Sequence, residues 1–426
     1  MSQTAHEPPY DPYAGNPLVK HLGPILQTEE ILKRLCCEPA MPRGLIDAPK
    51  ERRLHGLASL LRTFHIPSME EIRLYQTIDL MLRPGYQSRH PGLPATWQRL
   101  DTGAIFRNEP MSPPTAAFAE GPSGTGKSQA IAHCLSLFPQ LVRHSSFPMY
   151  KNGLNQIVWL TTHTPGSGTT RDLGTAMKDS LQRVLGPERF EHWLAHAARH
   201  RHSGFDECCQ IAATSFLGIL HIDDVESFFK IPPLRERQRS RGQTASASRE
   251  LRVVEDQCLK NIHHFINANR IPLLLSGTND GAAALQKRFS NAQRLAVAGY
   301  HRFHPFPSAD DEPFRLVFLP KLARYQCVRN PLPIDDALAT LLHDLTAGIR
   351  RLLVALWFHA HRVAFERKND DSLRLEDFKT AAATYMAPVA DAVQALLSRS
   401  PDALARYEDL LPREEGHWNA FWAASA

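Results

Sequence analysis

The sequence predicts an α/β fold in which helices cover both faces of a parallel sheet. Three observations in the 426 residues lead to this prediction. Between about residues 96 and 325, short apolar runs alternate with segments of helical periodicity, as in a sheet that is buried on both sides. A glycine-rich loop joins the first of these runs to a helical segment, and a later run ends in two aspartates.

Residues 1–95 are predicted to form an N-terminal helical extension. Thr28 can cap a short amphipathic helix, and Ser68 with Glu71 resembles a capping box that opens a longer one. We expect the longer helix to end at Arg83-Pro84-Gly85, because proline lacks a backbone donor and disfavours helical geometry at the preceding residue.

Residues 96–325 are predicted to be the α/β core and residues 326–426 a C-terminal helical lid and tail. The strands expected in the core cover residues 116–119, 156–160, 216–222 and 271–276. Helices are expected over residues 169–185 and 253–269 of the core, and over 335–355, 356–367 and from 375 and 401 in the lid. Because the carboxyl ends of parallel strands meet at one edge, a ligand is expected there.

The glycine-rich loop has the G-x-x-x-x-G-K-S pattern of a phosphate-binding loop. Its residues are Gly121, Pro122, Ser123, Gly124, Thr125, Gly126, Lys127 and Ser128. Glycines allow the backbone N–H groups to face a phosphate, and the following helix adds the positive end of its dipole. We expect Lys127 to reach the β- and γ-phosphates of ATP and Ser128 to ligate Mg²⁺. The alternative is a glycine- and serine-rich turn without a ligand.

Two aspartates follow the apolar run that ends near residue 222. Asp223 is expected to hold Mg²⁺ through water, because Mg²⁺ keeps much of its hydration shell. Asp224 stands where a glutamate usually orients the attacking water, so slow hydrolysis is expected, while Glu226 should point elsewhere. Thr278, at the end of the last predicted strand, can hydrogen-bond the γ-phosphate or the water. Both strand ends could instead be ordinary turns.

Arginines supply further candidates for phosphate contacts. Arg288, Arg294 and Arg302 could complete the site of a neighbouring subunit. The pair Arg350-Arg351 on a lid helix could place one arginine over the phosphates, and Arg351 is the candidate for this contact. Taken individually, each of these arginines is more often a surface residue than a catalytic one.

Charge and cysteine content leave two segments open. The net charge of +5 is matched by an arginine-rich stretch at residues 230–252, which could meet phosphates or be a solvated loop. His196, His200, His202, Cys208 and Cys209 could bind a metal or form an ordinary helix end, since their spacing matches no known zinc pattern. No apolar run is long enough to span a membrane and no signal-peptide pattern opens the chain, so a cytoplasmic location is expected.

Taken with these motifs, several segments resemble the TnsC/TniB family of AAA+ ATPases that regulate bacterial transposition. The matching segments are Asn16-Pro17-Leu18-Val19, Leu22-Gly23-Pro24-Ile25, Gly85-Tyr86, Pro165-Gly166-Ser167, Pro272 to Thr278, Ala292-Gln293-Arg294, Thr346 to Ile349 and Ala405 to Leu410. The resemblance covers most of the chain and assigns Arg294 as the arginine that acts in trans.

The resemblance implies that ATP-bound subunits assemble as a ring or helical filament on duplex DNA. The assembly would link a target-selection protein to the transposase and would disassemble on hydrolysis, in a bacterial cytoplasm. Thr161 stands where the family has a lysine, which leaves Thr169, Thr170, Arg171 and Lys178 as candidates for DNA contact. The alternatives are a different AAA+ machine, such as a helicase loader or a STAND-like switch, and an adaptor that binds ATP but scarcely hydrolyses it.

Overall fold

The computed structural model describes residues 10–102, 115–167, 169–186, 204–228, 253–279, 281, 297–368, 370–404 and 406–407. Within these residues a five-stranded sheet has the order β4-β5-β6-β1-β7, and each neighbouring pair is parallel. A separate antiparallel pair joins β2 to β3. The strands are β1 (Ala116–Glu120), β2 (Leu141–His144), β3 (Leu154–Ile157), β4 (Trp159–His163), β5 (Ile219–Asp223), β6 (Leu273–Gly277) and β7 (Gly299–Arg302).

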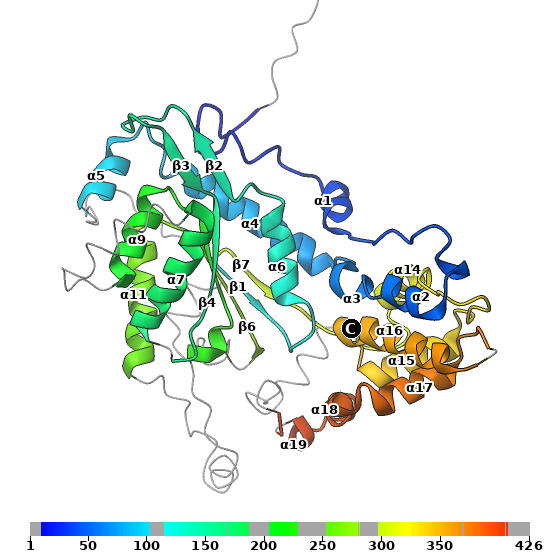
Figure 1. The fold of residues 1–426 in the computed structure, drawn as a ribbon. Helices are drawn as coiled ribbons and strands as arrows, with labels where there is room; N and C mark the ends of the chain where they lie inside the picture. Colours follow the sequence, from blue (N-terminus) through cyan, green and yellow to red (C-terminus); the bar gives the residue numbers. More distant parts are fainter. Residues whose placement is uncertain are drawn as a thin grey trace, which may run out of the picture.

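Helices cover both faces of the five-stranded sheet and form a second body beside it (Figure 1). The helices up to the lid are α1 (Thr28–Leu35), η1 (Leu45–Asp47), α2 (Lys50–Leu57), α3 (Leu60–Thr63), α4 (Met69–Gln87), α5 (Pro94–Thr102), α6 (Lys127–Ser136), α7 (Thr170–Leu185), α9 (Gly204–Thr214), η2 (Val225–Phe228) and α11 (Val253–Asn269). The lid region has η4 (Pro313–Phe318), α14 (Leu319–Ala323), α15 (Asp336–Thr346), α16 (Arg350–Glu366), α17 (Leu375–Thr384), α18 (Ala387–Ser398) and α19 (Pro401–Leu404). Of the helices described, none is both long and apolar enough to cross a bilayer.

The two faces of the sheet have separate apolar cores. Alternate residues of a strand point to opposite faces, so Phe118 and Leu275 pack towards α7, α9 and α11, whereas Ala119 and Leu274 pack towards α4 and α6. The strands are buried on both faces, as the apolar runs predict. The predicted α/β class is therefore confirmed.

The N-terminal segment contributes to two cores. Leu57 and Leu60, from α2 and α3, pack with Trp357 and Phe378 of the lid, whereas α4 packs against α6 and the sheet. The same division appears in Figure 1, where α2 and α3 lie beside α16 and α4 lies behind α6. The residues before 95 thus bridge the sheet domain and the lid.

Two predicted boundaries within the core region and the N-terminal region are wrong. Residues 156–160 do not form one strand, because the chain pairs with β2 up to Ile157 and with β5 from Trp159 onwards. The helix from Ser68 does not end at Arg83-Pro84-Gly85 but continues through Pro84 to Gln87. The last turn of this helix contacts the residues that lead into β5, because the Tyr86 hydroxyl donates to the carbonyl of Phe216 at 3.1 Å.

A third predicted boundary, in the lid, is also displaced. The helix expected over 335–355 ends at Thr346, and the next begins at Arg350 and continues past 356. Ala347 and Gly348 have φ values of +50° and +69° between the two helices. A Cβ on Gly348 would lie 2.1 Å from the carbonyl oxygen of Phe306, so glycine is required at this turn.

Candidate nucleotide site

The glycine-rich loop lies between β1 and α6, in the predicted strand–loop–helix context. Gly124 and Gly126 have φ values of +84° and +99°, which favour glycine. Gly121 has no room for a side chain, because a Cβ would lie 2.3 Å from the carbonyl oxygen of Phe303. The loop glycines therefore serve the backbone path that a phosphate-binding loop needs.

The lysine of the loop is held inside it. The Lys127 ammonium donates to the carbonyl oxygens of Gly121 at 2.7 Å and Pro122 at 3.2 Å, and the side chain is buried. The Thr125 hydroxyl also donates to Pro122, at 2.8 Å. This places a positive charge on the concave side of the loop, where phosphate oxygens bind in loops of this pattern.

Asp223 ends β5 directly beside the loop. Burial opposes ionisation of its carboxyl, but the neighbouring His221 and hydrogen bonds from Ser276, Ser128 and the Asp224 amide outweigh it, so the pKa of Asp223 lies below the ordinary value. Burial lowers the pKa of His221 to about 4. The structure thus brings the predicted pair, Ser128 and Asp223, into contact, and a hydroxyl with a carboxylate is a donor set that suits Mg²⁺.

Asp224 has an unusual backbone and an exposed side chain. Its φ is +58°, and the turn starts the short helix η2 immediately after the strand. Burial and the charge of Asp223 raise the pKa of Asp224. The His163 ring, at the end of β4, has Nδ1 3.7 Å from one Asp224 oxygen and 4.0 Å from Asp223. Asp224 therefore lies at the entrance to the acidic end of the site.

Glu226 does not point away from the site region, contrary to expectation. Because η2 turns the chain back, one Glu226 carboxylate oxygen accepts a hydrogen bond from the backbone N–H of Thr278 at 3.1 Å. Burial raises the pKa of Glu226. The buried Thr278, just after β6, is therefore tied to the segment just after β5, and the Glu226 carboxylate links the ends of these two neighbouring strands.

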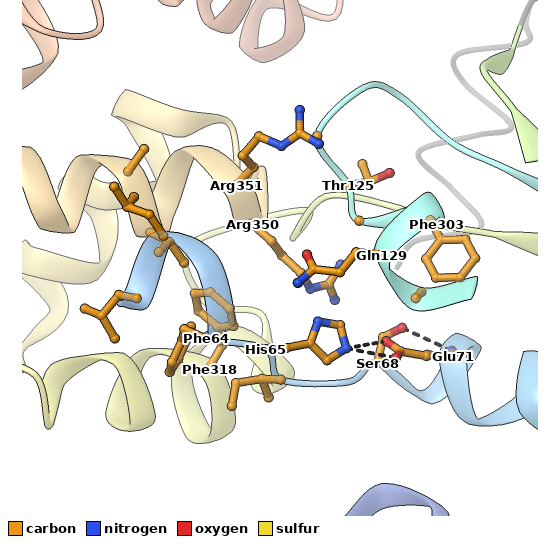
Figure 2. Close-up of a pocket in the computed structure, with 18 residues that line it drawn as sticks. Phe64, His65, Ser68, Glu71, Thr125, Gln129, Phe303, Phe318, Arg350 and Arg351 are labelled. Carbon is orange, nitrogen blue, oxygen red and sulfur yellow. Dashed lines mark hydrogen bonds and ion pairs between the residues drawn. The ribbon is translucent and has the colours of Figure 1, made fainter. Parts of the chain in front are cut away.

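A cavity of about 160 Å³ adjoins the loop, α6, the N-terminal segment and the lid (Figure 2). Its apolar walls include Leu60, Phe64, Phe318 and Val354. Its polar side includes His65, whose Nε2 lies 2.8 Å from a carboxylate oxygen of the buried Glu71. Mixed apolar and polar walls beside a phosphate-binding loop suit the base and sugar of a nucleotide.

The lid touches the loop through the start of α16. The Arg351 backbone N–H donates to the Gly124 carbonyl at 3.4 Å, and its exposed side chain extends towards the loop (Figure 2). Arg350, the other arginine of the pair, also lines the cavity. It donates to the carbonyl of His304 at 3.1 Å and lies over the Phe306 ring. The paired arginines after Ile349 were the sequence signal for both.

The residues expected to contact DNA lie at the start of α7, except for Lys178, which lies in the middle of that helix. The Thr169 hydroxyl caps the helix by accepting from the Asp172 amide at 3.2 Å, and the Thr170 hydroxyl accepts from Asn261 at 3.1 Å. Arg171 is exposed and Lys178 is half-buried. Both threonine hydroxyls therefore have structural roles already. Of the two cations, Arg171 is more accessible than Lys178.

The remaining candidates divide between described and undescribed residues. Arg302 pairs within its own chain, with Nε 3.1 Å from the buried Glu120. Arg288, Arg294, His196, His200, His202 and the stretch 230–252 lie outside the described residues. Cys208 is buried and donates to the Gly174 carbonyl at 3.5 Å, and burial raises its pKa to about 12, which disfavours the thiolate that a metal needs.

The fold and the site together define an α/β protein in which a loop of the phosphate-binding pattern joins β1 to α6 and a helical lid contacts the tip of that loop. The acidic end of β5 lies at the same edge of the sheet as this loop, because both follow the carboxyl ends of parallel strands. No model of a known protein family and no curated protein matches the sequence. Among solved structures, that of Drosophila ORC bound to DNA aligns with 82% of this chain and 68% of that chain, at 11% identity and a TM-score of 0.41.

Proposed function

We propose that this protein is an ATP-dependent regulator of transposition that oligomerises on target duplex DNA. It links a target-selection protein to the transposase, and ATP hydrolysis disassembles it. The nucleotide part of this proposal is supported by the site geometry. The transposition part is supported by the resemblance of the N-terminal, core and C-terminal segments to the TnsC/TniB family.

The observation that carries the proposal is the contact of three parts of the chain around one cavity. The loop, the lid helix α16 and the N-terminal segment all line it, so a bound nucleotide touches all three. Lys127 and Arg351 supply positive charge for the phosphates, while Ser128 and Asp223 would hold Mg²⁺, which neutralises phosphate charge when bound. Nucleotide binding can therefore set the position of the lid relative to the sheet domain, and that position can govern assembly.

DNA binding is proposed for the edge of the sheet that carries the start of α7. Arg171 is exposed there, and the α7 N-terminus adds the positive end of its dipole. Contacts of this kind engage phosphates rather than bases, so binding should tolerate different sequences and weaken steeply with salt.

A slow hydrolytic step is proposed from Asp224. The side chain is one methylene shorter than glutamate, and its left-handed backbone sets it at the exposed end of the site. Asp224→Glu should therefore raise the single-turnover rate if a longer carboxylate orients water better. An unchanged rate would instead favour the second candidate function, an ATP-binding adaptor that works by assembly alone.

Assembly on DNA tests the first function. Duplex DNA with a non-hydrolysable ATP analogue should yield large particles in light scattering and negative-stain microscopy. Lys127→Ala should abolish them, and Lys33→Ala, at an exposed lysine of α1, should not. Absence of particles despite nucleotide binding would contradict the proposal.

Arg294 provides a separate test of the proposed action between subunits. Arg294→Ala should leave nucleotide affinity unchanged and remove DNA-stimulated turnover, because a trans-acting arginine serves the neighbouring site. Loss of nucleotide binding itself would assign Arg294 a structural role within its own chain.

A further inference from the structure

Polar side chains cross three neighbouring strands on the face of the sheet that packs towards α6. They are Thr161 and His163 of β4, His221 and Asp223 of β5, and Ser276 of β6. Alternate positions along parallel strands share a face, so these residues lie together. Apolar side chains surround them on this face, including Ile219 of β5, Leu274 of β6 and Ala119 of β1.

The side chains of four of these residues form one hydrogen-bond chain. The Ser276 hydroxyl contacts Oδ1 of Asp223, and His221 Nε2 lies 2.8 Å from the same hydroxyl. On its other side, His221 Nδ1 lies 3.3 Å from the hydroxyl of Thr161. Ser276 and His221 are at most 2% exposed, so water does not substitute for these partners.

The proton positions in this chain follow from the capacity of each group. An ionised carboxylate only accepts, so the single Ser276 proton is donated to Asp223. The Ser276 oxygen must then accept from His221, which places the imidazole proton on Nε2. His221 Nδ1 is left as an acceptor for the Thr161 hydroxyl, so every member has one defined role.

The chain engages one particular oxygen of Asp223. Oδ1 accepts from Ser276 and also from the Asp224 N–H at 3.1 Å. Oδ2 is turned to the side of His163, whose Nδ1 lies 4.0 Å away. A carboxylate with one oxygen engaged twice cannot rotate freely, and it presents the other oxygen in a fixed direction.

We propose that Ser276, His221 and Thr161 are positioning residues that orient Asp223 for the divalent cation bound with the nucleotide. The inference rests on the proposed nucleotide function. Mg²⁺ requires near-ideal octahedral geometry, so a fixed carboxylate binds it better than a mobile one. A histidine buried in a sheet is unfavourable unless its ring nitrogens are hydrogen-bonded. An aliphatic residue would fill the same space without this cost, so packing alone does not explain a histidine at position 221. Mutation of a residue that hydrogen-bonds to a metal ligand typically lowers metal affinity by about 10- to 100-fold.

The test measures how Mg²⁺ tightens binding of a fluorescent ATP analogue. His221→Leu and Ser276→Ala should each raise the half-maximal Mg²⁺ concentration by about tenfold, with unchanged affinity for the analogue in EDTA. His221→Gln is the matched control, because its amide N–H can reach the position of Nε2. The half-maximal Mg²⁺ concentration of His221→Gln should stay within about threefold of the wild-type value. If His221 served packing alone, Gln would not preserve Mg²⁺ binding better than Leu.

Equal Mg²⁺ dependence in wild type, His221→Leu and Ser276→Ala would overturn the inference. If either buried variant does not fold, Thr161→Val breaks the chain at the edge strand β4. A raised Mg²⁺ requirement in Thr161→Val supports the inference, and an unchanged one contradicts it. Failure of the proposed function is distinguishable, because wild-type protein would then fail to bind the analogue with or without Mg²⁺.

Discussion

Gly124→Ala examines the contact between the tip of the phosphate-binding loop and the lid. An added Cβ would lie 2.9 Å from Cγ2 of Ile349, and the backbone φ of +84° is strained for any L side chain. A left-handed alanine costs about 1–2 kcal/mol relative to glycine. Overlap with a stiff, β-branched side chain adds about 1–3 kcal/mol. We therefore expect Gly124→Ala to lower the free energy of unfolding by about 3 kcal/mol.

A double-mutant cycle separates the two contributions. Ile349→Ala removes Cγ2, so the overlap disappears in the double variant while the backbone strain stays. Urea unfolding of the wild type, Gly124→Ala, Ile349→Ala and the double variant should give a coupling energy of about 1–2 kcal/mol. Gly166→Ala serves as control, because no atom lies within 4 Å of its added Cβ and its φ is not left-handed. The control should change stability by less than about 0.5 kcal/mol.

A coupling energy below about 0.5 kcal/mol would refute the reasoning, because distant and independent sites are additive within that margin. The loop tip and the start of α16 would then not be in contact in solution. A large effect of Gly166→Ala would show instead that loop glycines on this edge are generally sensitive.

Three further changes test other contacts. Burial opposes ionisation of Glu70, but His301 at 2.6 Å and the nearby Arg73 outweigh it and hold the pKa of Glu70 below 4.5. The ionised Glu70 therefore stabilises the fold above pH 4.5. This contribution is lost as the pH falls through the lowered pKa. Wild type should thus lose more stability on acidification than Glu70→Gln in a pH series of urea unfolding, and parallel curves would contradict this. Arg53→Ala should cost about 3 kcal/mol in thermal unfolding, because the buried guanidinium pairs with a lid carboxylate at 2.8 Å, whereas the exposed Arg52→Ala should have little effect. Arg351→Ala should weaken ATP affinity about tenfold in a fluorescent titration with stability unchanged, and equal affinity would exclude a phosphate contact.

Sequence patterns that depend on neighbouring residues predicted most of the core. The apolar run before Gly121, the loop and α6 follow from local spacing, as do α7 with Thr169 at its cap and α11. Strand order was beyond that reasoning, because pairing of β1 with β6 and β7 joins segments far apart in the chain. The edge strand β7 is four residues long, and its sequence GYHR contains no apolar run that would predict a strand.

The errors have tertiary causes. A continuous apolar run at residues 156–160 cannot reveal that the chain changes partner from β2 to β5. Proline usually ends a helix, but Pro84 is followed by a turn whose side chains bond to the carbonyls before β5, including Arg89 to Leu217 at 2.6 Å. Tertiary hydrogen bonds therefore outweigh the local preference there.

The candidate site was predicted in part for the same reason. Ser128 and Asp223 carry recognisable motifs, whereas the roles of His221 and Glu226 appear only once the strands are aligned. In the sequence, His221 is a single polar residue within an apolar run, and nothing in the run indicates a role for it. Its hydrogen bonds to β4 and β6 depend on strand order, which no local pattern contains.

The shared N-terminal segment has a consequence for how the chain folds during synthesis. Leu57 and Leu60 leave the ribosome early, but their apolar partners Trp357 and Phe378 are made about 300 residues later. A nascent chain therefore lacks these two partners of the leucines until the lid emerges. Long-range contacts of this kind slow folding and prolong exposure to aggregation. We expect folding on the ribosome to finish late, with nascent-chain protease resistance in this segment rising only after the lid has been translated.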